Sequence, residues 1–251
     1  MSKRRWFGLS KTRKPRQTRR RSLMRMWRVL VSLFAGLLLS QQGATQQHLT
    51  IPTQDGAAIA ADLYGAGTRG VVLAHGGRRT KADWAPQAEI LAAHGFCVLA
   101  FDFRGFGESP VPPPALQADE ALRFDVLAAV RYLHHHGART VAVIGASFGG
   151  VAAADASVAS EPGEIDRLVL LAHGSSSHPE LIKGRKLFVV GRDDTDGSGT
   201  MRLTEMRADY RKVRPPKRFV ILDGSAHAQF LFTTDQGDRL MREILQFLSA
   251  P

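Results

Sequence analysis

Cysteine is nearly absent from this sequence, whose 251 residues include only Cys97. A single cysteine cannot form a disulfide within the chain. Cys97 stands in an apolar segment, where a thiol is expected to fill core space rather than to react. Internal repeats are also absent, and low complexity is confined to a basic amino-terminal arm. About 200 residues remain for one domain, which is enough to bury a substantial core.

Acidic residues are missing from the first 28 positions, which hold 12 of the 34 Lys and Arg residues. The net charge of +11 therefore belongs to this arm, because the rest of the chain carries 22 basic and 23 acidic residues. A nucleic-acid-binding domain would gather basic residues on its folded surface. The near-neutral remainder argues against nucleic acid as a partner.

A long hydrophobic run is missing as well. The basic arm is followed by an apolar stretch at residues 29–39 and by small polar residues at 40–47. This order is typical of a secretory signal, since the apolar stretch is too short to span a bilayer core of about 30 Å comfortably. No clear cleavage site is visible, and Gly43 and Ala44 are the nearest candidates.

The domain organisation follows from this amino terminus. We expect residues 1–46 to form a basic arm plus a signal-peptide-like segment, and residues 47–251 to form one domain. The protein is then expected to be exported, either to the periplasm or outside the cell. The alternative is a protein anchored in the membrane by an uncleaved segment at residues 29–39.

Periodicity of apolar residues predicts the secondary structure. Two alternating runs, at residues 48–52 and 58–64, are joined at Asp55 and Gly56, which predicts an antiparallel hairpin. Wholly apolar segments then predict parallel strands at residues 71–74, 96–101, 141–144, 168–172, 187–190 and 219–222. Amphipathic segments predict helices near residues 84–94, 118–136, 148–159, 201–213 and 235–248.

This alternation predicts the α/β class, with a mostly parallel central sheet, helices on both faces and an antiparallel hairpin at the start. About 14 residues, 173–186, separate the fourth and fifth parallel strands, so no cap domain fits between them. Ligands of such sheets bind at the carboxyl ends of the strands. Residues that carry chemistry should therefore lie at those ends.

A serine occupies a small-residue turn directly after the third parallel strand, in the sequence Gly145-Ala146-Ser147-Phe148-Gly149. Glycines two residues before and after the serine let the flanking backbone approach closely, as a sharp strand-to-helix turn requires. Such a turn exposes the hydroxyl of Ser147 to an incoming carbonyl. A phosphate-binding turn would have the same local pattern, so a nucleophilic role for Ser147 depends on partners elsewhere in the chain.

A serine nucleophile needs a general base and a third group that orients the base. His227 follows the last strand and precedes a helix, and it is the expected base. Asp194 follows the fifth parallel strand after a turn at Gly191, and its carboxylate is expected to orient the imidazole. Asp193 is the alternative acid, and Asp196 a more remote one. No acid follows the fourth strand.

Two backbone N–H groups are expected to bind the oxyanion of a tetrahedral intermediate. His75, Gly76 and Gly77 directly follow the first parallel strand, and we name these three residues the oxyanion loop. The N–H groups of Gly77 and Phe148 are assigned as the two donors. His75 precedes the glycines and is expected to brace the loop rather than to act as the base.

These elements together resemble the α/β-hydrolase family over residues 48–250. The resemblance rests on the oxyanion loop, on residues 102–109, on the Ser147 turn, and on the order of serine, aspartate and histidine along the chain. Residues 102–109 are similar to the family's Asp-x-Arg-Gly-x-Gly-x-Ser segment, whose role is structural. The resemblance implies that Arg104 braces loops beneath the site and that Ser109 is not a nucleophile.

Because it has no room for a cap, the chain is similar to compact, lidless esterases and to dienelactone-hydrolase-like proteins. Ser147 stands where true dienelactone hydrolases have a cysteine, so their substrate is not carried over. We expect an exported serine hydrolase that cleaves carboxylic esters with short to medium acyl groups, through an acyl-enzyme and without a cofactor or metal ion. Its partner is then a small-molecule ester, and the oligomeric state is left open.

Two alternatives to an esterase stay open. Thioesterases and peptidases use the same three residue types, so the bond that is cleaved is not fixed by the motifs. A different class of function is a non-catalytic member of the fold that binds a ligand or a partner. In that case residues 1–46 would associate with an anionic membrane, transiently or as an anchor.

Two further clusters carry weaker signals. His134, His135 and His136 end a predicted helix, where histidine favours the negative end of the dipole. Consecutive helical positions do not converge on one metal ion, so metal binding is not expected there. Basic residues at 78–81 follow the oxyanion loop and are expected to form a solvated loop, with attraction of anionic substrates as the alternative.

Overall fold

The computed structural model of this chain describes residues 46–250, which fold around one eight-stranded sheet. The predicted basic arm and signal-peptide-like segment, residues 1–46, lie outside the described residues apart from Gln46. The division at residue 46 therefore stays a prediction. Among residues 46–250, no helix combines the length and the apolar character needed to cross a membrane.

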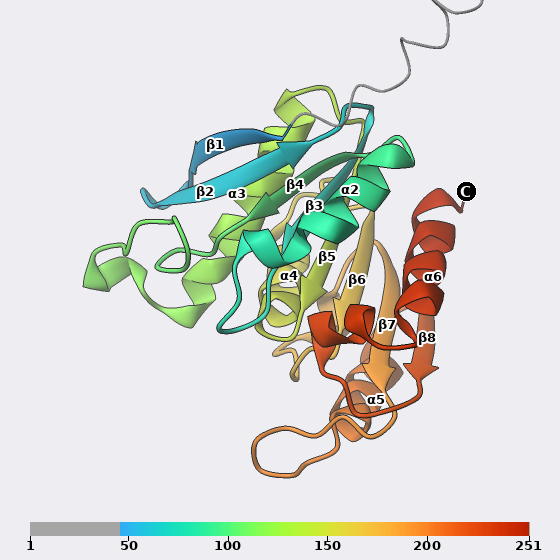
Figure 1. Ribbon diagram of the computed structural model, residues 1–251. Coiled ribbons are helices and arrows are strands. Elements are labelled where there is room, and N and C mark those ends of the chain that lie inside the picture. Colours follow the sequence, from blue (N-terminus) through green and yellow to red (C-terminus); the bar gives the residue numbers. More distant parts are fainter. Residues whose placement is uncertain (1–45, 251) are drawn as a thin grey trace, which may run out of the picture. The chain divides into compact units, whose positions relative to one another are not determined.

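The sheet is mixed, with the strand order β1-β2-β4-β3-β5-β6-β7-β8 (Figure 1). β2 pairs antiparallel with both β1 and β4, whereas all other neighbours are parallel. The strands are β1 (Gln47–Pro52), β2 (Ala58–Tyr64), β3 (Arg69–Ala74), β4 (Cys97–Phe101), β5 (Thr140–Ala146), β6 (Arg167–Leu171), β7 (Arg185–Gly191) and β8 (Lys217–Leu222). The predicted hairpin and the mostly parallel sheet are confirmed.

Helices cover both faces of this sheet, as predicted. α2 and α6 lie on one face, and α3, α4 and α5 lie on the other (Figure 1). Their bounds are α2 (Ala85–Ala93), α3 (Leu122–His135), α4 (Phe148–Ala159), α5 (Arg202–Lys212) and α6 (Gly237–Ser249). α3 begins later than predicted because residues 119–121 form a separate short turn, η3 (Asp119–Ala121). The connection from β6 to β7 holds only the short turn η4 (Pro179–Leu181), so no cap is inserted there.

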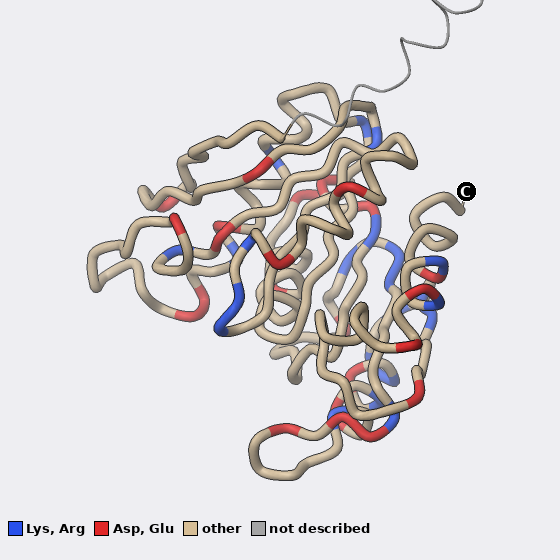
Figure 2. Tube along the Cα trace, viewed as in Figure 1, with Lys and Arg blue, Asp and Glu red and all other residues tan. Residues whose placement is uncertain are grey.

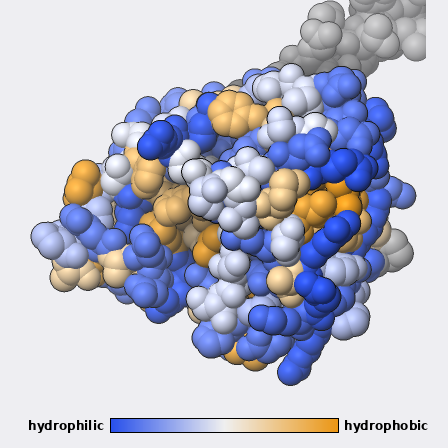
Figure 3. All heavy atoms as spheres, turned by 90° about the horizontal axis from the view of Figure 1, so that it is seen from below, coloured by the Kyte–Doolittle hydropathy of each residue, from blue (hydrophilic) through white to orange (hydrophobic). Residues whose placement is uncertain are grey.

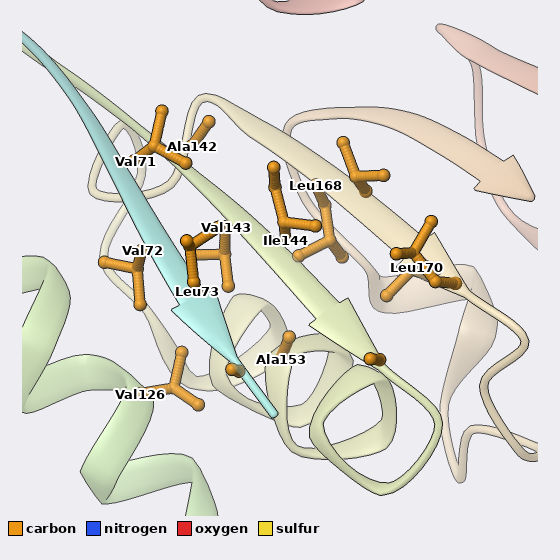
Figure 4. Packing of buried hydrophobic residues seen from close by; sticks show 14 of the residues in the cluster. Val71, Val72, Leu73, Val126, Ala142, Val143, Ile144, Ala153, Leu168 and Leu170 are labelled. Carbon is orange, nitrogen blue, oxygen red and sulfur yellow. The ribbon is translucent and has the colours of Figure 1, made fainter. Parts of the chain in front are cut away.

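The core surrounds the central strands. Side chains of β3, β5 and β6 point alternately to the two faces, and Val126 of α3 and Ala153 of α4 pack against one of them (Figure 4). Val72, Val143 and Leu168 are fully buried, as are most residues of these strands. Burial on both faces is the reason that the parallel strands are apolar throughout rather than alternating.

Arg104 ties three segments together beneath the carboxyl ends of the strands. Its Nε and Nη2 atoms donate to the Asp125 carboxylate on α3 at 2.9 and 2.6 Å, and Nη1 donates to Asp55 in the β1–β2 turn at 2.7 Å. Nη1 also donates to the Leu116 carbonyl at 2.9 Å. Burial alone would lower the pKa of Arg104, but its hydrogen bonds with the two carboxylates outweigh burial and raise it. These contacts agree with the bracing role that the resemblance implies.

Charges elsewhere on the domain are intermixed. Lys and Arg residues are interspersed with Asp and Glu residues in Figure 2, and Arg192 and Asp223 form an exposed pair. Arg192 pairs with Asp223 at 3.1 Å, and their side chains are 57% and 68% exposed. The buried Arg104 and the exposed Arg192 therefore offer a matched comparison.

We predict that Arg104→Met destabilises the fold by about 3–5 kcal/mol, because it leaves the buried Asp125 carboxylate without its cation. Arg192→Met should change stability by less than about 1 kcal/mol, since water screens an exposed pair. Urea unfolding followed by circular dichroism measures both. Equal losses in the two variants would contradict a bracing role for Arg104.

Candidate active site

The turn from β5 into α4 places Ser147 at the carboxyl edge of the sheet. Ser147 is the residue before α4 and has φ 50° and ψ −113°, a conformation that non-glycine residues rarely adopt. A Cβ atom on Gly145 would lie 2.5 Å from the carbonyl oxygen of Gly149, and one on Gly149 would overlap the carbonyl oxygen of His75. Glycine is therefore required at both positions, for the reason expected from the sequence.

The structure brings Ser147, His227 and Asp194 together from three loops. Ser147 Oγ lies 2.7 Å from His227 Nε2, and His227 Nδ1 lies 2.8 and 3.0 Å from the two carboxylate oxygens of Asp194. With Nδ1–H directed at the carboxylate, Nε2 is left to accept the hydrogen of the serine hydroxyl. Asp194 is buried, whereas the His227 side chain is 34% exposed and open to a substrate. This geometry lets His227 take a proton from Ser147 during attack on a carbonyl.

The other two carboxylates considered for this role point elsewhere. Asp193 is exposed, and its backbone N–H donates to the Gly224 carbonyl at 3.0 Å. Asp196 accepts hydrogen bonds from Ser198 and Thr200 within its own loop. Of the three candidates, Asp194 is the one whose carboxylate contacts His227.

The oxyanion loop lies against the start of α4. A Cβ atom on Gly77 would come within 3.9 Å of the Phe148 Cβ, so the two assigned donors are neighbours. In the described part of the chain, neither the Gly77 N–H nor the Phe148 N–H donates to another group. Both N–H groups are thus free to bind an oxygen beside Ser147.

His75 holds this loop from within the core, as expected. It is fully buried; its Nδ1 donates to the Gly76 carbonyl at 2.8 Å, and its Nε2 accepts from the Phe103 N–H at 3.1 Å. Burial lowers the pKa of His75, which favours the neutral imidazole that this pair of contacts requires.

Phe148, the residue after Ser147, lines a cavity of about 270 Å³ together with Val151, Ala152 and Leu122. Three carboxylates, those of Asp119, Glu120 and Asp155, also line it. Burial raises the pKa of Asp155 despite the attraction of Arg123 and His178. The carboxyl ends of β7 and β8 point to the bottom of Figure 1, so the view from below in Figure 3 shows the side of the molecule on which these strands end. Hydrophobic residues are exposed there among hydrophilic ones.

Sequence reasoning missed these pocket residues. Asp119 and Glu120 precede α3, and Asp155 lies in the middle of α4, so nothing in the local pattern brings them together. Only the spacing of Phe148, Val151 and Asp155 at three- and four-residue steps could have indicated a shared helix face.

The clusters with weaker signals have structural roles. Lys81 corrects the expectation of a solvated basic loop at residues 78–81: it is 5% exposed and pairs with Asp62, Asp102 and Glu108 at 2.8–3.6 Å. The ring nitrogens of His134 contact the carbonyls of Ala138 and Glu164. Across residues 46–250, no group of three or more His, Cys, Asp or Glu side chains could hold a metal ion.

Ser109 and Cys97 are also accounted for by packing. Ser109 Oγ donates to the Asp102 carbonyl at 2.6 Å and accepts from the Ala60 N–H at 2.8 Å, so its hydroxyl is engaged in the scaffold. Cys97 is a buried residue of the core, and burial raises the pKa of its thiol. Neither side chain belongs to the cluster around Ser147.

Comparison with known proteins agrees with this architecture. The family model described as alpha/beta hydrolase fold matches residues 70–195, half of the chain. The esterase Pf2001 of Pyrococcus furiosus has a similar structure, with a TM-score of 0.67 and 20% identity, over 81% of this chain and 93% of that one.

Two further solved structures are similar to the same extent. An esterase from Exiguobacterium antarcticum has a TM-score of 0.68 and 14% identity, over 81% of this chain and 100% of that one. A dienelactone hydrolase from Anabaena variabilis has a TM-score of 0.66 and 18% identity, over 82% and 97%. Identities this low report on the fold alone.

We predict that Asp194→Asn slows acylation of Ser147 by about 10,000-fold, because the amide no longer holds His227 in the tautomer that accepts the serine proton. Asp193→Asn is the matched control and should leave the rate unchanged within about threefold, since that carboxylate does not contact His227. Stopped-flow kinetics with p-nitrophenyl acetate measures both rates. A larger loss in the Asp193 variant would assign the acid differently.

Proposed function

This chain belongs to the α/β-hydrolase family, and from that premise we propose that it is a serine hydrolase acting on carboxylic esters. One observation carries the proposal: the unbroken chain of hydrogen bonds from Ser147 through His227 to Asp194. Acyl transfer requires a nucleophilic hydroxyl, a base that takes its proton and an acid that orients the base, and these three side chains supply them.

The reaction begins when Ser147 Oγ attacks the ester carbonyl and His227 Nε2 takes the hydroxyl proton. The carbonyl oxygen becomes an oxyanion, which the N–H groups of Gly77 and Phe148 stabilise. The imidazolium then gives its proton to the leaving alcohol as the carbon–oxygen bond breaks, which leaves an acyl group on Ser147. Water, deprotonated by His227, attacks this acyl-enzyme; the bond from the acyl carbon to Ser147 Oγ then breaks as the imidazolium returns the proton to Oγ, which releases the acid and restores the serine hydroxyl. Asp194 stays ionised throughout and stabilises the imidazolium.

The substrate is proposed to carry a short to medium acyl group. The cavity of about 270 Å³ beside Phe148 is small for a binding pocket, which commonly encloses about 300–1,000 Å³. The connection between β6 and β7 contains no cap domain that could add an apolar wall for a long acyl chain. The carboxylates of Asp119, Glu120 and Asp155 favour a neutral acyl group over an anionic one.

The geometry of the site bears differently on the two rival functions. A thioesterase or peptidase would use the same three side chains, and only substrate comparison separates them from an esterase. A non-catalytic binding protein would have no need for a strained serine, and strained backbone clusters at functional sites. The positive φ of Ser147 therefore favours catalysis over simple binding.

We predict that the full chain hydrolyses p-nitrophenyl acetate and butyrate faster than the palmitate ester, because the cavity beside Phe148 accepts only a small acyl group. Ser147→Ala should lower the short-chain rate by about 1,000,000-fold, since removal of the nucleophile disables the whole triad. Steady-state absorbance assays across the ester series measure this.

The outcomes of this series separate the rival functions. Activity on acyl thioesters or peptides alone would replace the esterase assignment with the corresponding hydrolase. A folded protein with no activity on any of the three, and no labelling of Ser147 by a fluorophosphonate, would favour the binding protein. A preference for palmitate would contradict the argument from the cavity.

We further propose that the protein is exported to the periplasm or secreted. The support is the order of basic, apolar and small polar residues before position 47, which lies outside the described part of the chain. Mass spectrometry of the natural protein should give a chain that begins near residue 45. A full-length mass in the membrane fraction would instead indicate an anchor at residues 29–39.

A further inference from the structure

Gly76, in the middle of the oxyanion loop, is held at both of its backbone polar groups. Its N–H donates to the side-chain oxygen of Gln229 at 2.8 Å, and its carbonyl accepts from His75 Nδ1 at 2.8 Å and from the Arg79 N–H at 3.2 Å. Gly76 itself lies close to the nucleophile, because a Cβ atom built on it would be 3.7 Å from the Ser147 Cβ and 3.4 Å from Gln229 Oε1. The contact with Gln229 therefore occurs beside the reacting atoms.

Fixing Gly76 also fixes the direction of the next N–H group. The Gly76 carbonyl and the Gly77 N–H belong to one planar trans peptide, so they point in opposite directions. Gly76 has no side chain to restrict its own rotation, and glycine has wide conformational freedom. Two hydrogen bonds at the Gly76 carbonyl and one at its N–H thus supply the restraint on the assigned oxyanion donor that the residue itself lacks, and Gln229 provides the one at the N–H.

Gln229 comes from the same short segment as the general base. It is the second residue after His227 and lies in η5 (Ala228–Thr233). Between them Ala228 has φ 50° and is buried, so the chain turns sharply and aims both side chains into the site. A single segment therefore carries the base that contacts Ser147 and the acceptor that holds the oxyanion loop.

The amide of Gln229 is otherwise poorly satisfied. The side chain is 6% exposed, and its Nε2 atom has no hydrogen-bond partner within the described residues. Its orientation is fixed, because the Gly76 N–H is a donor and can face only the amide oxygen. A buried donor without a partner opposes folding and offsets part of what the bond to the Gly76 N–H contributes to stability.

We propose that Gln229 is a positioning residue, which orients the Gly77 N–H toward the oxyanion by holding the Gly76 N–H. This inference rests on the proposed hydrolase function. The interaction makes the geometry of the oxyanion site depend on the position of the loop that carries His227. A purely structural role for Gln229 would instead affect folding without affecting the transition state selectively.

The test compares three variants of the full chain. Gln229→Met removes the acceptor at nearly constant volume, and Gln229→Glu keeps an acceptor oxygen at the same place. Gln246→Met makes the first substitution at an exposed position of α6 and serves as the control. Two readouts are needed: kcat and KM for p-nitrophenyl butyrate, and hydrogen exchange of the Gly76 amide measured by NMR.

Gln229→Met should lower kcat by about 10- to 100-fold, less than the 100- to 1,000-fold that follows removal of an oxyanion donor. KM should change by less than about threefold, because the ester ground state carries no oxyanion. The Gly76 amide should exchange at least tenfold faster, as expected for an N–H that has lost its acceptor. Gln229→Glu should restore most of both properties, and Gln246→Met should change neither.

Other outcomes overturn the inference. Unchanged kcat or unchanged Gly76 exchange in Gln229→Met would show that the contact does not position the loop. A fall in kcat matched by the Glu variant would show that an acceptor at this place is not what matters. If the wild-type chain neither hydrolyses esters nor reacts with a fluorophosphonate, the proposed function fails. The exchange readout then still decides whether Gln229 holds Gly76.

Discussion

Close approach of the backbone on either side of Ser147 is the constraint on which the site depends. Gly145 at the end of β5 lies against the carbonyl of Gly149 in α4, and a side chain at either glycine would occupy space already filled. Ser147 keeps its left-handed conformation only because β5 and α4 are both fixed in the core, since such strain costs of order 1–3 kcal/mol. Packing of the sheet is therefore part of the chemistry.

Parallel strands bring the remaining groups to the same edge, and backbone hydrogen bonds hold their loops in register. The Arg192 N–H donates to the Leu222 carbonyl at 2.7 Å, and the Asp193 N–H donates to the Gly224 carbonyl at 3.0 Å. These bonds join the loop of Asp194 to the loop of His227. Contact between the acid and the base thus rests on the main chain of β7 and β8, which leaves their side chains free to meet.

The fold could be predicted because short local sequence patterns determine its elements. Wholly apolar strands and a glycine-flanked serine each have a signature a few residues long, and the positions of Asp194 and His227 directly after predicted strands then indicated the acid and the base. Lys81 and Gln229 had no such signature, because their roles depend on partners far along the chain: Glu108 for Lys81, and Gly76, 153 positions away, for Gln229. Sequence patterns predict elements well, but not which side chains meet between them.

Neutrality of His75 links the site to the stability of the core. Its Nε2 faces the Phe103 N–H, so a proton on that nitrogen would set two donors against each other. Burial lowers the pKa of His75 below its ordinary value near 6.5, which keeps Nε2 an acceptor. Because the unfolded chain binds a proton at His75 more readily than the folded one, this residue's contribution to stability is complete above pH 6.5. The contribution is lost as the pH falls below that value. The same imidazole holds the Gly76 carbonyl, so the condition that preserves the core also preserves the oxyanion loop.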